Sequence, residues 1–130
     1  MEQCKISSFS VLSNSKILVY AVPLEGPGLF EYTLCTTIRV IESGDLCTWQ
    51  IVKLLSFLEV FNLTVEVSDR DNCQVMSFSY LDAFGKEIPV NLMVYRDHTS
   101  LSVNGVYLAF LEDICKEIAK QEERERNIRQ

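Results

Sequence analysis

The stretch Ser43–Asp69, SGDLCTWQIVKLLSFLEVFNLTVEVSD, predicts a turn, an amphipathic helix and a strand in direct succession. Gly44 and Asp45 interrupt the apolar run before it, and either Asp45 or Thr48 can cap the helix. The apolar residues of the helix recur at helical spacing and form one stripe: Ile51, Leu54, Leu55, Leu58 and Phe61. The next seven letters, LTVEVSD, alternate apolar and polar residues, which is typical of a half-buried strand. This succession predicts a helix that packs on a sheet.

Trp49 lies in the first turn of this helix, and we place it on the flank of the apolar stripe beside Val52. A side chain of this size more often anchors packing than binds a ligand. We therefore predict that Trp49 is a buried core anchor, with an exposed, functional tryptophan as the less favoured alternative.

Before the helix, three segments have the composition of strands. Lys5–Leu12 partly alternates, Lys16–Val22 is a compact apolar run, and Phe30–Glu42 is dense in aromatic and β-branched residues. The segment Pro23–Gly28 between the last two holds two prolines and two glycines, so it predicts a loop.

After the helix, Leu63–Asp69 and Cys73–Asp82 predict a hairpin, because both alternate and a polar turn separates them. Ile88–Asp97 is interpreted as an edge strand, with Pro89 near its start, and Thr99–Gly105 as a short return. A terminal helix follows, with an apolar stripe made of Leu108, Leu111, Ile114, Cys115, Ile118 and Ala119. The expected fold class is α+β, a small curled sheet or OB-like β-barrel with one packed helix and a C-terminal helix.

Length and composition bound the organisation of the chain. Its 130 residues, 48% of them hydrophobic, are enough for one domain, which we expect over residues 1–120, with a charged and frayed tail over 121–130. No apolar run reaches the roughly 18 residues that span a bilayer, and the N-terminus lacks the pattern of a signal peptide. We therefore expect a cytoplasmic protein that makes no membrane contact.

Reactive groups are few and scattered. The five cysteines include no CxxC pair, and the only histidine, His98, has no cysteine near it in sequence, so no metal or cofactor site is predicted. No nucleotide-binding, hydrolase or zinc-protease motif occurs. Arg39 lies inside a predicted strand, where it faces solvent or pairs with a carboxylate. The sequence predicts a protein that is not an enzyme.

Four segments resemble the staphylococcal-nuclease-like half of extended Tudor domains over about residues 30–111. They read YTLCTTIRVIESGDLCTW, LTVEVSD, VMSFSYLDAFGK and SVNGVYLAFL. The positions that carry the resemblance are Cys35, Gly44, Asp45, Trp49, Leu63, Val65, Val67, Leu81, Asp82, Gly85, Val103, Asn104 and Leu108. The resemblance implies an OB-like five-stranded barrel. It does not imply nuclease activity, because only Arg39 falls near a family arginine and Gln74 stands about where a second would be.

The Tudor half of that family recognises methylarginine in an aromatic cage, and this chain lacks the stretch that usually carries it. Tyr20, Phe30 and Tyr32 are close enough in sequence to suggest a cage, but packing of a strand core explains them equally well. None of them is assigned to a cage.

The function predicted from these observations is a noncatalytic protein-interaction module, an adaptor or scaffold that the resemblance connects with RNA-silencing or germ-granule assembly. The alternative is a small virus- or bacterium-encoded chaperone or inhibitor that binds one protein client. Nucleic acid is the least favoured partner, because 18 acidic residues against 12 basic ones give a net charge of −6. We predict that a protein partner contacts Ile114 and Ile118 on the final helix and Met93 and Tyr95 on the strand segment before it, and we leave homo-oligomerisation open.

Overall fold

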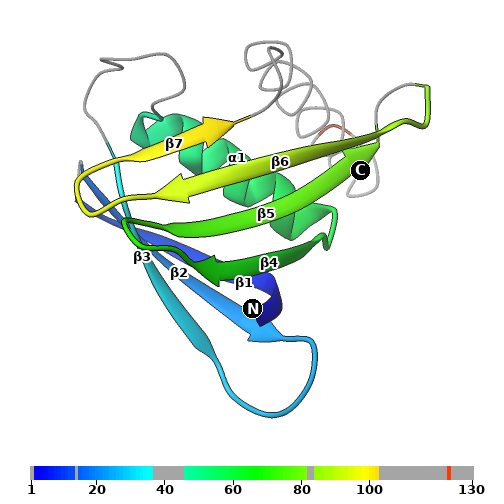
Figure 1. The fold of residues 1–130 in the computed structure, drawn as a ribbon, viewed down its shortest axis with the longest axis horizontal. Helices are drawn as coiled ribbons and strands as arrows, with labels where there is room; N and C mark the ends of the chain where they lie inside the picture. The colour runs from blue at the N-terminus through cyan, green and yellow to red at the C-terminus, as the bar shows by residue number, and fades with distance from the viewer. Residues whose placement is uncertain (1, 14, 37–45, 82–83, 103–122, 124–130) are drawn as a thin grey trace.

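The computed structural model describes residues 2–13, 15–36, 46–81, 84–102 and 123. Within these ranges the elements are β1 (Glu2–Ser13), β2 (Lys16–Pro23), β3 (Phe30–Cys35), α1 (Thr48–Val60), β4 (Thr64–Asp69), β5 (Gln74–Leu81), β6 (Glu87–Val94) and β7 (Thr99–Ser102). The strands form one antiparallel sheet in the order β3-β2-β1-β4-β5-β6-β7. The sheet curls, and α1 lies against its concave side (Figure 1).

This architecture confirms the expected α+β class, a curled sheet with one packed helix. The strand order runs from β3 at one end to β7 at the other, and these two strands do not pair within the described ranges. The sheet formed by the described residues is therefore open. The predicted C-terminal helix, with Ile114 and Ile118, lies outside the described residues.

The predicted hairpin between Leu63–Asp69 and Cys73–Asp82 is present as β4 and β5. Its turn is closed by the backbone N–H of Arg70, which donates to the carbonyl of Cys73 at 2.8 Å. Alternation decides which side chains enter the core, because successive residues of a strand face opposite sides of the sheet. In β4 the apolar positions Val65 and Val67 are buried.

The core lies between α1 and the concave face of the sheet. From the helix it receives Ile51, Leu54, Leu55, Phe57 and Leu58, and it continues through buried side chains of every strand. The residue that caps the helix is Cys47, whose N–H donates to the side-chain Oε1 of Gln50 at 2.8 Å. The prediction that Thr48 is the cap is wrong, since Thr48 is the first helical residue, and Asp45 lies outside the described residues.

The prediction that Trp49 is a core anchor is also wrong, because its side chain is 60% exposed. Each helical residue turns the direction of the side chain by about 100°, so Trp49, two positions before Ile51, lies on roughly the opposite side of the helix from the buried stripe. The position on the flank of that stripe predicted for Trp49 is therefore wrong.

The edge-strand interpretation of Ile88–Asp97 is wrong as well. The strand β6 pairs with β5 along its whole length and with β7 from Asn91 to Val94. The segment after it, expected to be a short return, forms β7, which lies at the end of the described sheet. Within the described ranges, no helix is long and apolar enough to cross a membrane.

Candidate protein-interaction site

An open sheet has two edge strands, and each can leave a row of unpaired backbone groups. At the β7 end, the N–H of Leu46 donates to the carbonyl of Thr99 at 2.9 Å, so the chain that enters α1 covers this part of the edge. At the opposite end, β3 pairs with β2 alone among the described strands. The open edge of the described sheet is therefore β3.

The direction of the backbone groups of β3 follows from its pairing with β2. The N–H of Thr36, directly after β3, donates to the carbonyl of Ser15 at 2.9 Å, and so points toward the β2 side. In an antiparallel pair both backbone groups of a residue point to the same side, and the side alternates from one residue to the next. The backbone groups of Glu31, Thr33 and Cys35 therefore point away from β2.

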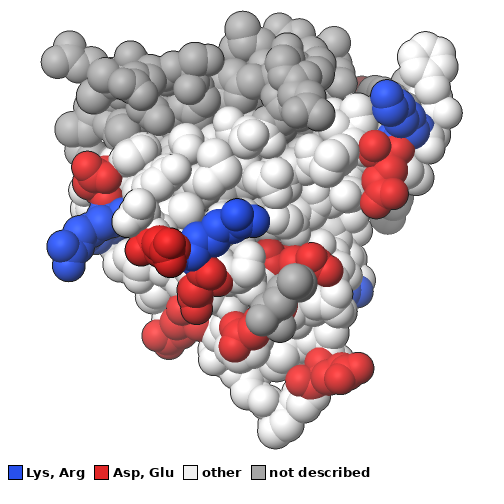
Figure 2. Space-filling model, in the orientation of Figure 1, with Lys and Arg blue, Asp and Glu red and all other residues white. Residues whose placement is uncertain are grey.

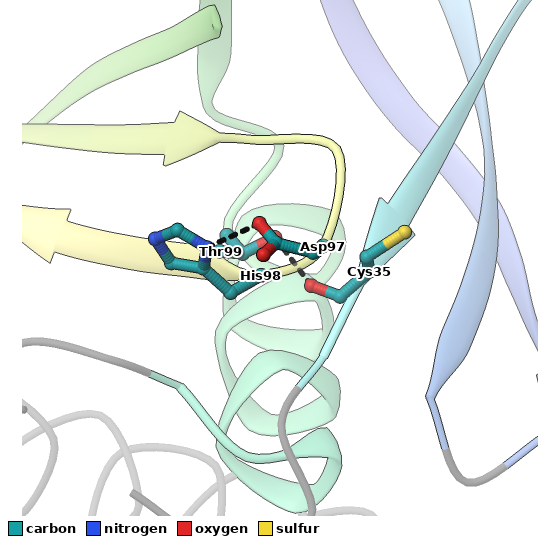
Figure 3. Close-up of polar contacts among 4 residues, drawn as sticks. All are labelled: Cys35, Asp97, His98 and Thr99. Carbon is teal, nitrogen blue, oxygen red and sulfur yellow. Dashed lines mark hydrogen bonds and ion pairs between the residues drawn. The ribbon is translucent and has the colours of Figure 1, made fainter. Parts of the chain in front are cut away.

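One of these outward groups already has a partner. The carbonyl of Cys35 accepts a hydrogen bond from the hydroxyl of Thr99 at 2.7 Å, which brings the start of β7 against the end of β3 (Figure 3). Thr99 is fully buried. This contact closes the C-terminal end of the edge and leaves the outward backbone groups of Glu31 and Thr33, which we call the β3 edge.

The other end of β3 is approached through a glycine-rich loop. Gly26 and Gly28 have φ values of 83° and 123°, which a residue with a side chain rarely adopts, so they let the chain turn there from β2 into β3. Two large apolar side chains of this loop are exposed, Leu24 by 43% and Leu29 by 54%. Exposed apolar groups beside an open edge are typical of an interaction surface.

A cleft of about 410 Å³ lies next to this loop, and we call it the acidic cleft. Its lining comes from the start of β1, the end of β2, the loop and the start of β3: Glu2, Gln3, Pro23, Leu24, Glu25 and Phe30. One carboxylate oxygen of Glu2 accepts a hydrogen bond from the hydroxyl of Tyr32 at 3.2 Å. The ring of Tyr32 in turn lies 6.2 Å from that of Phe30, measured between centroids.

Two buried groups that interact with Glu2, the phenol of Tyr32 and the thiol of Cys4, have a raised pKa. Burial is the main cause that raises the pKa of the Tyr32 phenol well above its ordinary value of 10.0, and the carboxylate of Glu2 adds to it. Burial also raises the pKa of the Cys4 thiol above 9.0, again with help from Glu2. Both groups are therefore neutral at physiological pH.

The predicted partner-binding residues do not come together with this site. Met93 lies in the interior of the sheet, opposite Val75 on one side and Ser100 on the other, so its backbone belongs to two strand pairs. Tyr95 follows β6, and its ring stacks on His98 with centroids 4.5 Å apart. Ile114, Ile118 and Arg39 lie outside the described residues.

Other chemistry is sparse in the part of the chain that the structure describes. That part holds no group of three or more His, Cys, Asp or Glu side chains that could bind a metal ion. His98 contacts Asp97, whose Oδ1 lies 2.7 Å from the histidine Nδ1 (Figure 3), and this hydrogen bond lowers the pKa of the aspartate. Cys4 is buried, whereas Cys35, Cys47 and Cys73 are half-buried thiols.

Comparison with known proteins gives no relative: no family model, no curated protein and no solved structure matches the chain. Sequence analysis missed Glu31 and Thr33 because nothing in the letters FEYTLC says which strand lies at an end of the sheet. The glycine-rich loop and the carboxylates beside it can be recognised in the sequence. That Glu2 lies close to them cannot, because this depends on the pairing of β1 with β2.

Proposed function

We propose that this protein is a protein-interaction module, not an enzyme, and that it binds an extended segment of a partner protein by strand addition at the β3 edge. The observation that carries the proposal is the pair of outward backbone groups at Glu31 and Thr33. In strand addition the main chain supplies hydrogen bonds, and side chains at alternate positions supply selectivity.

The regularity of β3 supports the proposal. Exposed edges are usually protected by proline, lysine or a β-bulge, each of which prevents another strand from pairing. The strand FEYTLC contains neither proline nor lysine, and its register with β2 is continuous from Phe30 to Cys35. The pairing of β1 with β2, by contrast, has two register shifts. An incoming strand therefore meets a straight edge, guarded by the single charge of Glu31.

An adaptor and a chaperone or inhibitor would both use such an edge, and they differ in the number of segments they accept. An adaptor in RNA silencing or granule assembly, the setting suggested by the Tudor resemblance, recognises one motif in defined components. A chaperone accepts many unrelated extended segments. The selectivity of the β3 edge therefore distinguishes the two forms of the proposal.

The test compares two variants at one position. Thr33→Pro removes the outward N–H and adds a ring to the edge, while every hydrogen bond toward β2 is kept; Thr33→Val keeps the N–H and serves as the matched control. A displayed library of random peptides of about eight residues, close to a usual strand length, is selected on each variant. We expect sequences to be enriched on Thr33→Val and lost on Thr33→Pro.

Amide exchange measured by NMR supplies the second readout and needs only the parent protein. With an enriched peptide bound, the amides of Glu31 and Thr33 should become protected. Equal enrichment on both variants, or protection that leaves these two amides unchanged, would contradict strand addition at β3. One enriched motif would favour an adaptor, and many unrelated sequences would favour a chaperone.

A further inference from the structure

We propose that the segment bound at the β3 edge is basic, and that a lysine or arginine next to its paired residues occupies the acidic cleft. This inference rests on the function proposed above and adds the chemical class of the partner. Its elements are the carboxylates of Glu2 and Glu25 in the cleft and that of Glu31 on the edge strand itself.

Within the part of the chain that the structure describes, these carboxylates have no cationic partner. Among the described residues, no lysine or arginine lies within ion-pair distance of Glu2, Glu25 or Glu31. Lys16, the lysine of β2, stands opposite Cys35, at the other end of β3. On the face that includes the N-terminus, acidic side chains predominate over the lower part of the molecule (Figure 2). The potential around the site is therefore negative and attracts a cation.

The cleft has the chemistry to hold a long basic side chain as well as its charge. Pro23, Leu24 and Phe30 give apolar surface for the methylene stem, and the ring face of Phe30 is itself attractive to a cation. Glu2 is held by the hydroxyl of Tyr32 at 3.2 Å, so one acceptor for the charged end is already positioned. Less side-chain freedom is then lost when the partner binds.

The route from the edge to the cleft is short. Phe30 belongs both to β3 and to the lining of the cleft, and it directly precedes Glu31. A strand paired with Glu31 and Thr33 that continues past the start of β3 therefore passes the mouth of the cleft. Every second side chain of the added strand faces the side of the sheet on which Phe30 and Tyr32 lie. A basic residue at one of these positions is therefore on the same face as Phe30.

The same charges argue against other occupants. A second copy of this chain would bring its own Glu31 to the edge. Each copy has a net charge of −6, so the two copies would repel each other. A nucleic acid would bring phosphates to carboxylates. A basic protein segment is the occupant that the electrostatics favour.

The probes are three acetylated, fluorescent peptides of about eight residues, a usual strand length. In each, valine alternates with a second residue, which is lysine, threonine or glutamate. Binding is measured by fluorescence anisotropy at about 0.1 M and about 1 M NaCl, between which the Debye length falls from about 10 Å to about 3 Å. We expect the lysine peptide to bind at least about tenfold more tightly than the threonine peptide at low salt, with most of this advantage lost at high salt. The glutamate peptide should not bind.

Glu2→Gln/Glu25→Gln should weaken binding of the lysine peptide by about fivefold and leave the threonine peptide unaffected. The matched control, Glu59→Gln/Glu87→Gln, removes the same charge from exposed positions on α1 and β6 and should change neither affinity. An equal loss in both double variants would show that net charge acts and not the cleft, which would overturn the inference.

Amide exchange separates the two levels of the proposal. If the threonine and lysine peptides bind equally and both protect Glu31 and Thr33, strand addition stands and the basic preference is wrong. If none of the peptides protects these amides, while the parent is folded, strand addition fails and the inference fails with it. If a peptide of this chain's own β3 sequence protects them better than the lysine peptide, a second copy is the occupant and the inference is likewise wrong.

Discussion

The hydroxyl of Thr99 and the backbone carbonyl of Cys35, 64 positions apart in the sequence, form a hydrogen bond of 2.7 Å (Figure 3). It joins the first residue of β7 to the last residue of β3, the two strands at opposite ends of the sheet. The sheet curls around α1 far enough for its two ends to meet at this hydrogen bond. The contact also sets the limit of the β3 edge.

Removing this hydroxyl should destabilise the protein. In Thr99→Val the shape of the side chain is nearly kept, but the buried donor is lost and the carbonyl of Cys35 loses its partner, so we expect the free energy of unfolding to fall by about 1–3 kcal/mol. Thr99→Ser keeps the donor and should cost less. Urea unfolding of both variants measures the difference, and equal losses would show that the hydrogen bond contributes little.

Hydrogen exchange should alternate along β3 in the free protein. The amides of Tyr32 and Leu34 point toward β2 and should be protected, whereas those of Glu31 and Thr33 face solvent and should exchange at least about a hundredfold faster, a difference of roughly 3 kcal/mol in opening free energy. Exchange followed by two-dimensional NMR resolves each amide. Protection of all four would mean that something other than β2 covers the edge.

The elements of this fold were predictable where their signals are local. The helix follows from the spacing of Ile51, Leu54 and Leu58, and the β4–β5 hairpin follows from two alternating runs around a polar turn. Neither needs knowledge of the rest of the chain. The loop between β2 and β3 was predictable for the same reason, because its prolines and glycines are a local signal.

The strand order was not predictable, because it depends on pairings between distant segments. β1 lies between β2 and β4, although β2, β3 and α1 separate it from β4 in sequence. That pairing brings Gln3 opposite Glu66, where the amide of Gln3 donates to the carboxylate at 2.9 Å. The identity of the open edge, and with it the candidate site at Glu31 and Thr33, is a property of this order and not of any one segment.

The exposed position of Trp49 on α1 can be tested by fluorescence, because Trp49 is the only tryptophan of the chain. Its side chain is 60% exposed, so its fluorescence should be red-shifted and quenched by acrylamide in the folded protein. We expect Trp49→Ala to lower the free energy of unfolding by less than about 1 kcal/mol, since substitutions at exposed positions seldom cost more. The fully buried Leu54 is the comparison: Leu54→Ala should cost about 2–5 kcal/mol. A Trp49→Ala loss as large as that of Leu54→Ala would contradict the exposed position.

The protein should lose stability in alkaline solution through Tyr32 and Cys4. Both side chains have a pKa that is raised in the folded state, chiefly by burial, above the ordinary values of 10.0 and 9.0. At a pH above these ordinary values the unfolded chain releases protons that the folded chain retains, so ionisation favours unfolding. Their contribution to stability is complete below about pH 9 and declines as the pH rises beyond it.

The variant Tyr32→Phe isolates the share of the phenol in this decline. It removes the titrating hydroxyl together with the hydrogen bond to Glu2 at 3.2 Å, so it should be less stable than the parent at neutral pH. Between about pH 10 and pH 11, however, its stability should fall less steeply with pH, because one group with a raised pKa is gone. Urea unfolding at matched ionic strength from pH 8 to pH 11, values that span the ordinary pKa values of both groups, measures both slopes. Parallel slopes for parent and variant would show that the pKa of Tyr32 is not raised in the folded protein.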